Sequence, residues 1–424
     1  MKRTFAILLI LLLFSAGLAL AGGAQDKAAE AETITVLMGI DAAGKHMGER
    51  AEEFTAKTGI NVNLIEVEWD TMVNKQAVAL TAGEPTYDIV DCGSFMLPEY
   101  VPGGMYEDIS DLFPPDVKAK YMDGMIESVT VDGKVYAAPL MASWTIMFYN
   151  SEMYEKAGLD PKKPPKTWDE LVAAGKAIQA VDKTAYAYTD SMAHGEQNSC
   201  VFFRWAKSAG AEIGEFRGSK YYWMLNSDEC VAAVEFLKRM MDENVMDPGA
   251  PIYYQQQVAD LFGKGHAAML VNWDMMTIAF RDPEQSPYAG KIFPAAMPGR
   301  VAGLSGSIEG HEYMAVPSAS LHKEAAKEFI KYVTSVENVK RRALEQGMTP
   351  VYKELFEDPE VKKALPLDVI FSAAANCYYR PAVPEYAECA EVISTELQNV
   401  LVNDKDVRQA LNDANDRCNE LSGW

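Results

Sequence analysis

Long hydrophobic runs are nearly absent from this sequence, and the one exception stands at its start. Two basic residues lead into the apolar run FAILLILLLF at residues 5–14, and small residues then follow up to Ala21. This arrangement is typical of a signal peptide, which we predict at residues 1–21, cleaved after Ala21. The run is shorter than the ~20 residues that cross a bilayer, so a retained membrane anchor is the weaker alternative. Because no cysteine stands near the cleavage site, we expect no lipid anchor.

Cysteine and histidine are also scarce. The six cysteines form no C-x-x-C and match no zinc spacing, and the five histidines include no pair at i and i+4. We therefore predict no metal site. Disulfides stay open, because an even number of cysteines in an exported chain permits them, while a chain of this size does not need them.

Basic residues are outnumbered by acidic ones. Lys and Arg total 39 against 61 Asp and Glu, which gives a formal net charge of −22. An acidic protein gains little from contact with phosphate groups, so we expect neither nucleic acid nor an anionic lipid surface as a partner. The charge says nothing positive about a ligand.

Familiar catalytic motifs are missing as well. There is no G-x-x-x-x-G-K-[ST], GKGHAAM lacks the third glycine of a dinucleotide loop, HEYMA lacks the second histidine of a zinc protease, and GLSGS is no nucleophile elbow. We predict no cofactor. A pair of glycosidase carboxylates cannot be judged from sequence in so acidic a chain, so the enzyme hypothesis is weakened without being excluded.

What is present is the pattern of an α/β protein. A leader of small and charged residues spans 22–32, and residues 33–424 exceed the roughly 250–300 residues that one core holds, so two lobes are expected. Strand-like segments at 32–40, 60–69 and 87–93 alternate with helical ones, which indicates a doubly wound, mostly parallel sheet. Ligands bind outside the carboxyl ends of such strands.

Aromatic residues stand beside short polar ones where elements end. The segment WDTMVN places Trp69 and Asp70 after a strand, and AMLVNWDMM ends an apolar strand with Trp273 and Asp274. The segment NCYYRPAVPEY places Tyr379 and Arg380 before prolines, and Trp144 interrupts the apolar run of GKVYAAPLMASWTIMFYN. Such pairs suit a ligand that has both an apolar face and polar groups.

Several ordered segments resemble the extracellular solute-binding proteins of family 1, the carbohydrate-type receptors of ABC importers. The most specific is DGKVYAAPLMASWTIMFYNSEMYEKAGLDPKKPPKTWDELVAAGKAI, and YDIVDCGSFMLPEYVPGGMYEDISDLF precedes it. The segments FGKGHAAMLVNW, EFIKYVTSVENVKRRALEQGMTPVYKELFEDPEV and RPAVPEYAE follow in the family's order. Together they extend over about residues 33–421.

The resemblance implies a two-lobed periplasmic-binding-protein fold of the type II kind. Each lobe would be a mostly parallel sheet flanked by helices, with the ligand cleft between the lobes and the chain crossing near 138–142, 311–316 and 347–351. The first lobe would hold 33–139 plus 312–347, and the second 140–311 plus 348–424. It further implies a periplasmic monomer that closes on a small-molecule solute, most simply a sugar, and presents it to membrane permease subunits.

The resemblance also places individual residues. Asp91 matches the acid of the family's first lobe, Trp144 follows the first crossing, Trp273 lies where the family often stacks a sugar, and Arg380 precedes the proline of the last segment. Three features depart from the pattern: Cys92-Gly93 after the acid, no Gly-Pro near Trp273, and a bulky Trp144. These departures leave the identity of the ligand open.

The ligand-binding candidates combine aromatic rings for the apolar face of a pyranose with polar groups for its hydroxyls. Each candidate has a structural alternative: core or hinge packing for the tryptophans, helix or turn capping for Asp70 and Asp91, an ion pair for Arg380, and a solvated loop for His194 and Gln197. The full set is Trp273, Trp144, Asp91, Trp69, Asp70, Arg380, Tyr379, Asp274, His194, Gln197 and Glu309.

Other ligands and functions remain as alternatives. The same fold could receive a polyol, a sugar phosphate or a polyamine. Phosphate would favour clustered cations, and Arg380 is the only candidate cation, whereas a polyamine would suit the several acids. Outside the fold class, an exported glycan-cleaving enzyme and a sensor partner that transports nothing also remain.

Overall fold

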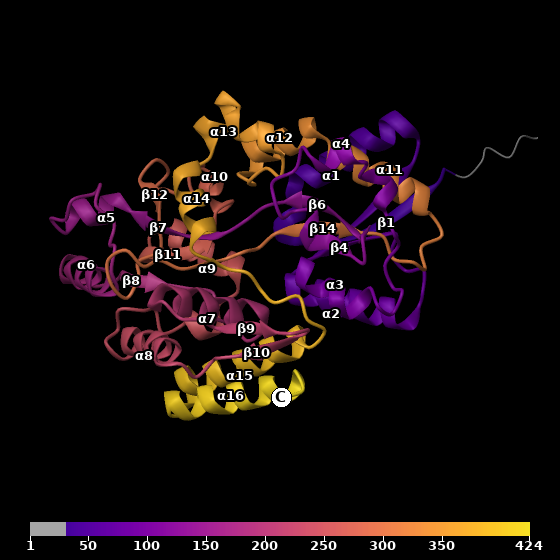
Figure 1. The fold of residues 1–424 in the computed structure, drawn as a ribbon. Helices are drawn as coiled ribbons and strands as arrows, with labels where there is room; N and C mark the ends of the chain where they lie inside the picture. Colours follow the sequence, from indigo (N-terminus) through magenta and orange to yellow (C-terminus); the bar gives the residue numbers. More distant parts are fainter. Residues whose placement is uncertain (1–30) are drawn as a thin grey trace, which may run out of the picture.

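The computed structural model describes residues 31–424. The predicted signal peptide, residues 1–21, and nearly all of the predicted leader lie outside the described residues. Every helix within residues 31–424 is too short or too polar to span a lipid bilayer. Two lobes, each built on a β-sheet, lie side by side (Figure 1).

The first lobe is built on a five-stranded sheet with the strand order β2-β1-β3-β14-β6. Strand β1 pairs in parallel with both β2 and β3, and β14 pairs antiparallel with both β3 and β6. The strands are β1 (Thr33–Gly39), β2 (Asn61–Val67), β3 (Ile89–Cys92), β6 (Ala137–Met141) and β14 (Glu312–Ala315). The predicted early strand-helix alternation is therefore confirmed.

The second lobe is built on a four-stranded sheet with the order β12-β7-β11-β8. Strand β7 pairs antiparallel with β11 and β12, while β11 pairs in parallel with β8. The strands are β7 (Thr145–Asn150), β8 (Tyr186–Thr189), β11 (Ala267–Trp273) and β12 (Ile292–Ala295). Both β7 and β11 are buried along their whole length, as their near-continuous apolar sequences predict.

Each sheet contains one strand that runs against the others. These strands, β14 and β7, are the ones by which the chain enters each lobe from the other one. A chain that arrives from the neighbouring lobe enters at the edge where the parallel strands end, so its first strand must run the opposite way. The predicted two-lobed, mostly parallel α/β fold is confirmed, and the carboxyl ends of its strands face the boundary between the lobes.

Helices flank both sheets (Figure 1). The helices along the chain segments that form the first lobe are α1 (Ile40–Thr58), α2 (Trp69–Ala82), α3 (Leu97–Tyr100), α4 (Pro115–Lys118), α11 (Lys323–Val333) and α12 (Val336–Gln346). The others are α5 (Ser151–Lys156), α6 (Trp168–Val181), α7 (Glu196–Ala209), α8 (Asp228–Asp242), α9 (Gln255–Gly263), α10 (Met276–Ala279), α13 (Pro359–Ala364), α14 (Leu367–Ala375), α15 (Tyr386–Asn403) and α16 (Val407–Leu421).

Short elements complete the chain. The 3-10 helices are η1 (Ser94–Met96), η2 (Ser110–Leu112), η3 (Glu127–Val129), η4 (Ala250–Ile252) and η5 (Lys353–Glu357). The minor strands form three two-stranded ladders, and they are β4 (Thr130–Val131), β5 (Lys134–Val135), β9 (Gly214–Arg217), β10 (Lys220–Trp223), β13 (Ser307–Ile308) and β15 (Cys377–Tyr378).

Local sequence explains where individual helices begin and pack. The Thr167 hydroxyl accepts the Glu170 N–H at 3.2 Å, which caps the start of α6. Next to the cap, Trp168 is buried and stacks on Phe236 at 4.4 Å between ring centroids, in the core of the second lobe. All six cysteines lie in the described part as free thiols, and Cys389 on α15 faces Cys418 on α16.

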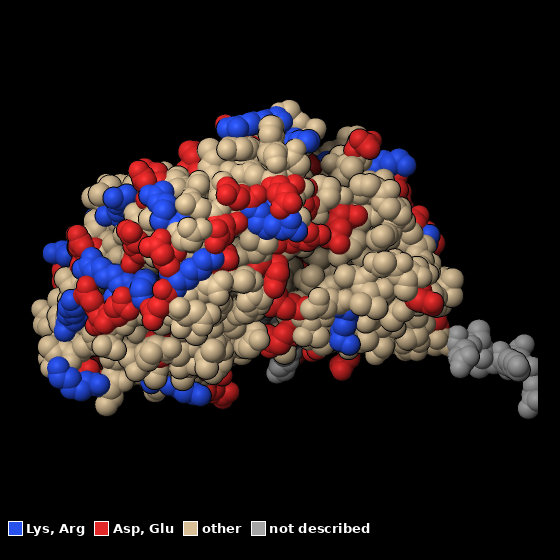
Figure 2. All heavy atoms as spheres, turned by 90° about the horizontal axis from the view of Figure 1, so that it is seen from below, with Lys and Arg blue, Asp and Glu red and all other residues tan. Residues whose placement is uncertain are grey.

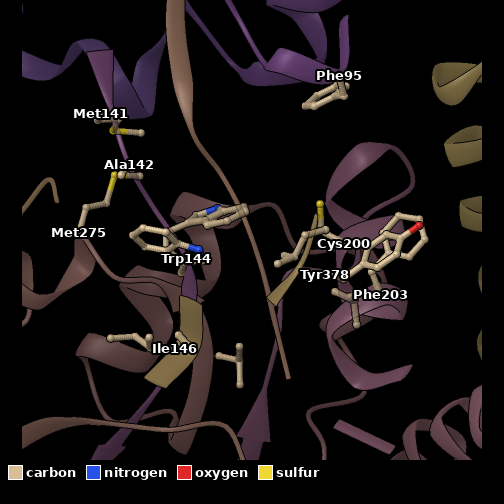
Figure 3. Packing of buried hydrophobic residues seen from close by; sticks show 14 of the residues in the cluster. Phe95, Met141, Ala142, Trp144, Ile146, Cys200, Phe203, Met275 and Tyr378 are labelled. Carbon is tan, nitrogen blue, oxygen red and sulfur yellow. The ribbon is translucent and has the colours of Figure 1, made fainter. Parts of the chain in front are cut away.

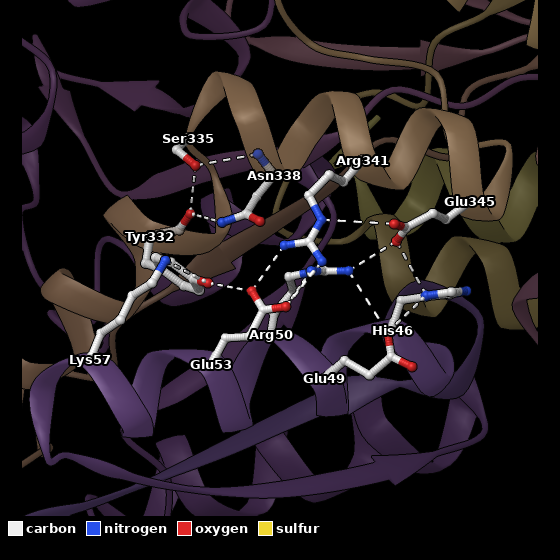
Figure 4. Close-up of polar contacts among 10 residues, drawn as sticks. All are labelled: His46, Glu49, Arg50, Glu53, Lys57, Tyr332, Ser335, Asn338, Arg341 and Glu345. Atoms are coloured by element: carbon white, nitrogen blue, oxygen red, sulfur yellow. Dashed lines mark hydrogen bonds and ion pairs between the residues drawn. The ribbon is translucent and has the colours of Figure 1, made fainter.

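The first lobe is tied together by a polar network between α1 and α12 (Figure 4). Arg50 is fully buried and donates to Glu53 at 3.0 Å and to Glu345 at 2.9 Å. Arg341 donates to the same Glu53 at 2.9 Å and lies 3.7 Å from Glu345. Opposite charges alternate around this closed ring, so the buried Arg50 guanidinium has a carboxylate partner on each side, while the other three side chains are partly exposed.

The chain crosses between the lobes three times, and the crossing segments bond to one another. Ala142 donates its N–H to the Thr349 carbonyl at 3.1 Å, and Gly310 donates to the Ser143 carbonyl at 2.9 Å. The predicted boundary after residue 139 falls within β6, whose last residue, Met141, still pairs with Glu312. The chain therefore leaves the first sheet after Met141.

Candidate ligand-binding cleft

A cleft of about 860 Å³ lies between the lobes, at the carboxyl ends of the strands. From the first lobe, its walls come from the start of α2, which follows β2, and from η1 and α3, which follow β3. From the second lobe they come from the start of α7, the residues before and within the start of α9, and the start of α15. Because the walls come from both lobes, a bound solute would contact both.

A smaller inner pocket of about 30 Å³ continues this cleft. Four residues line both spaces: Trp69, Glu196, Gln197 and Gln255. The inner pocket is also lined by Trp273, His311 and Arg380, among others. Two tryptophans from opposite lobes thus line one pocket, Trp69 at the start of α2 and Trp273 at the end of β11.

The Trp273 indole is held by two contacts. Its Nε1–H donates to the Gln255 side-chain oxygen at 2.8 Å. Its ring lies so close to Gly310 that a Cβ at that position would be 2.5 Å from the ring, so no larger residue fits there. Gln255 is 5 % exposed, and its Nε2 donor has no hydrogen-bond partner among the described residues. The pocket therefore contains a fixed aromatic ring beside an unused donor.

Asp70 reaches from the first lobe toward the second. It lies in the first turn of α2, and its carboxylate approaches Gly195, where an added Cβ would lie 2.6 Å from Oδ2. Burial raises the pKa of Asp70, and the nearby charges of Glu196 and Glu391 raise it further, against the hydrogen bond from the Glu196 N–H. Gly195 is the N-cap of α7 and supplies no side-chain cap, so Asp70 serves the helix start from across the cleft.

Arg380 is the centre of a buried network in the second lobe. Its Nε donates to Glu309 at 3.0 Å and its Nη1 donates to Glu196 at 2.9 Å, where Glu196 also accepts from the Tyr386 hydroxyl at 2.7 Å. The guanidinium lies over the Phe95 ring of the first lobe, 4.0 Å from its centroid. The Glu309 charge holds the pKa of Arg380 well above its usual value, although burial opposes it. The side chain thus joins the second lobe to the first.

Asp274 lies where the crossing segments meet. Its Oδ1 accepts from the Ser143 hydroxyl at 2.7 Å and from the Trp144 N–H at 3.3 Å, and its Oδ2 accepts from the Thr349 hydroxyl. Ser143 belongs to the first crossing and Thr349 to the third. Burial raises the pKa of Asp274 to about 6, because these neutral donors only partly offset the loss of water. The residue connects the crossings to the loop after β11.

Trp144 is buried at the first crossing. It is 2 % exposed and packs its ring edge against His311 at 4.7 Å between centroids. Met141, Ala142 and Met275 surround it on one side (Figure 3). Burial, together with the charge of Arg380, lowers the pKa of His311 to about 3, so the ring is neutral and its Nδ1 accepts the Ser143 N–H at 3.1 Å.

Comparison with known proteins gives a family for this fold and cleft. Residues 42–340 match the model of the bacterial extracellular solute-binding proteins. The chain belongs to this family.

Within residues 31–424, no group of three or more His, Cys, Asp or Glu side chains could hold a metal ion.

Curated relatives and solved structures agree with this assignment. A putative binding protein of Brucella abortus is 25% identical over 373 residues, which cover 88% of each chain. The diacetylchitobiose-binding protein DasA of Streptomyces coelicolor is 26% identical over 368 residues, covering 86% of this chain and 83% of the relative. The maltose-bound structure of MalE3 from T. maritima superposes with a TM-score of 0.85 at 25% identity, covering 92% of this chain and 100% of the other.

The structure brings six of the predicted binding residues of this solute-binding protein to the cleft or its inner pocket. They are Trp69, Asp70, His194, Gln197, Trp273 and Arg380. The alternative that Asp70 caps the helix directly after it is wrong, because Glu68 is the N-cap of α2 and Asp70 lies in its first turn. Its carboxylate instead accepts the Glu196 N–H at the start of α7 in the opposite lobe.

The other five predicted residues lie outside both cavity linings. Glu309 accepts from the Arg380 guanidinium but lines neither cavity. Asp274 and Trp144 lie at the crossings, and Tyr379 is 55 % exposed. Asp91 is buried and accepts the Gly39 N–H at 3.1 Å. For these five residues a ligand contact stays a prediction.

Several cleft residues were not predicted from the sequence, above all Gln255, Glu196, Phe95 and Tyr386. Gln255 begins α9 directly after two tyrosines, and Glu196 adjoins the predicted Gln197. These neighbours offered a weak signal for the two polar residues. Phe95 and Tyr386 look like ordinary core residues in the sequence, and only the meeting of the two lobes places their rings 5.0 Å apart.

Proposed function

We propose that this protein captures a carbohydrate, a mono- to oligosaccharide, in the cleft between its lobes and delivers it unchanged to the permease of an ABC importer. The observation that carries the proposal is the interlobe cleft of about 860 Å³, which the Trp69 ring lines from one lobe and Gln255 lines from the other. Among the described residues, the Gln255 Nε2 donor has no hydrogen-bond partner. A pyranose offers two apolar faces for aromatic rings and a rim of hydroxyl oxygens for amide donors.

The relatives support the same class of ligand. The structural relatives include a maltose-bound protein and a protein from Thermotoga lettingae with bound α-D-tagatose, which superposes with a TM-score of 0.84 at 25% identity. The curated relatives include proteins named for binding diacetylchitobiose and arabinooligosaccharides. One relative is named as a probable ABC-transporter-binding protein, and by analogy we assign a permease as the partner here.

The organisation that we propose follows the strand ends. The first lobe comprises residues 33–141 plus 312–347 and the second comprises 142–311 plus 348–424, joined by the three crossings. The lobes would close on the solute as hinged bodies. We further propose a periplasmic monomer without a lipid anchor, whose signal peptide is cleaved after Ala21. Sequencing the N-terminus of the exported protein tests the cleavage site directly.

A thermal-shift screen with maltose, D-tagatose, arabinose oligosaccharides and polyols tests the ligand class. A solute at 100 times its dissociation constant should add ~2.7 kcal/mol to the free energy of unfolding. The proposal fails if the folded protein responds neither to these solutes nor to an amino-sugar disaccharide. Incubation of the best ligand with the protein, followed by chromatography, tests delivery without chemical change, and the appearance of a shortened glycan would favour a glycan-cleaving enzyme instead.

A further inference from the structure

The charge of the cleft has a feature that neutral sugars do not require. Five carboxylates line the main cleft, Glu68, Asp70 and Glu99 from the first lobe and Glu196 and Glu391 from the second. No lysine or arginine is among its lining residues in the part of the chain that the structure describes. Figure 2 views the molecule from below relative to Figure 1 and shows acidic side chains gathered along the middle of that face, between the lobes.

The nearby positive groups leave this charge largely uncompensated. Exposed His194 lies 3.3 Å from Glu391 and is charged only when protonated. Arg380 lines the inner pocket but not the main cleft, and its guanidinium already pairs with both Glu309 and Glu196. Asp70 accepts the Glu196 N–H across the lobe boundary and lies close enough to the Glu196 and Glu391 carboxylates for their charges to raise its pKa. Like charges this close in a partly dry cleft repel one another. A cation between them would convert that repulsion into attraction.

A second, independent feature limits what kind of cation fits. The Gln255 side chain is 5 % exposed and lines both the cleft and the inner pocket, and its Nε2 donor has no hydrogen-bond partner within residues 31–424. A buried donor needs an oxygen acceptor, and a simple polyamine has none. Trp69, which lines the main cleft as well as the inner pocket, adds an apolar face suited to a sugar ring.

Resting on the proposed carbohydrate function, we propose that the solute is a cationic amino sugar, with protonated amines facing the carboxylates of both lobes and a ring oxygen or hydroxyl accepting from Gln255. A sugar phosphate or an acidic sugar would be repelled from this cleft. The volume of about 860 Å³ accommodates more than one ring, which favours an amino-sugar oligomer.

Calorimetric titration with three β-1,4-linked disaccharides tests the inference. The glucosamine dimer carries two ammonium groups, cellobiose carries hydroxyls in their place, and diacetylchitobiose carries neutral amides. We expect the glucosamine dimer to bind at least about tenfold more tightly than cellobiose at low salt, since hydrogen bonds to charged groups are the stronger ones. The advantage should shrink in ~0.5 M salt, which screens exposed charges.

Two charge-removing variants locate the effect. Asp70→Asn keeps a side-chain oxygen for the α7 start and should reduce the advantage of the amine several-fold. Asp116→Asn, at an exposed site on α4 outside the cleft lining, should leave it unchanged. Circular dichroism of both variants verifies that they are folded.

The outcomes separate the inference from the proposed function. If cellobiose binds as tightly as the glucosamine dimer, the inference is overturned and the carbohydrate function stands. If spermidine binds while the three disaccharides and the solutes of the thermal-shift screen do not, both are overturned. An amine advantage that Asp70→Asn reduces and Asp116→Asn preserves supports both.

Discussion

Arg50 and Arg380 are both buried arginines that bind two glutamates, yet they lie in different settings. Arg50 binds Glu53 and Glu345 within one lobe, where α1 and α12 pack together (Figure 4). Arg380 binds Glu309 and Glu196 in the second lobe, but its guanidinium also covers Phe95 of the first lobe and lines the inner pocket.

The difference teaches that a buried ion network does not by itself mark a site. In the α1–α12 network every charge finds its partner in the same lobe, which suits a structural role. In the Arg380 network a face of the cation remains directed at the boundary between the lobes, where opening would expose it. Position relative to the boundary between the lobes, more than chemistry, separates the two networks.

Removal of Arg380 should give the largest effect on stability. Arg380→Ala leaves Glu309 buried without its cation and Glu196 without one of its donors, which we expect to lower the free energy of unfolding by about 3–5 kcal/mol. Urea denaturation measures the loss. An effect no larger than that of Arg341→Ala would contradict the distinction between the two networks.

Asp274 is a buried carboxylate that pairs with no cation among the described residues, so it contrasts sharply with the carboxylates that Arg380 binds. Burial raises the pKa of Asp274 from 3.8 to about 6, so the stability it contributes is present below about pH 4 and lost as pH rises to 6. Asp274→Asn keeps an oxygen for Ser143 and should remove this loss. Relative to the wild type, the variant should gain about 2–3 kcal/mol between pH 4 and pH 7.

Urea denaturation of both proteins at several pH values measures that difference. The comparison with the variant is needed because His311, whose pKa is lowered to about 3, contributes the opposite slope over the same range. For a depressed histidine pKa, stability rises with pH up to the unfolded value of about 6.5. A pH-independent difference between wild type and variant would refute the assignment to Asp274.

Loss of one cleft tryptophan should weaken ligand binding more than it weakens the fold. Trp69→Ala removes a half-buried ring from the inner pocket, and we expect about a tenfold loss of affinity for the best solute of the thermal-shift screen. Calorimetry measures this loss. Trp424→Ala, at an exposed ring outside the cleft, is the matched control and should bind normally.

The smallest effect is expected in the α1–α12 network. Arg341 is about one-third exposed, and Glu53 keeps bonds from Arg50 and the Tyr332 hydroxyl without it. Arg341→Ala should therefore cost less than about 1 kcal/mol, and the cost should fall further at high salt. A loss as large as that of Arg380→Ala would mean that the closed ring is as critical as the boundary network.

Much of the fold follows from local sequence. Alternating strand and helix segments predict the parallel part of the first sheet, and residues Thr167 and Glu170 define the start of α6. Trp69, Asp70 and Trp273 were identified because aromatic and polar residues directly follow strands, where parallel sheets bind ligands. The boundary after residue 139 stays a prediction, and strand β6 continues to pair for two residues beyond Pro139.

The sequence by itself determined the two-lobed α/β class, the acidic character and the aromatic-polar positions, because these depend on periodicity and composition. Only the tertiary structure decided which of those positions share a cavity. It directs Trp69 and Trp273 to one pocket, binds Asp274 to two crossings, and joins Arg380 to Phe95. The physical reason is that each of these contacts joins residues far apart along the chain, and their geometry is set by how two separately built sheets meet.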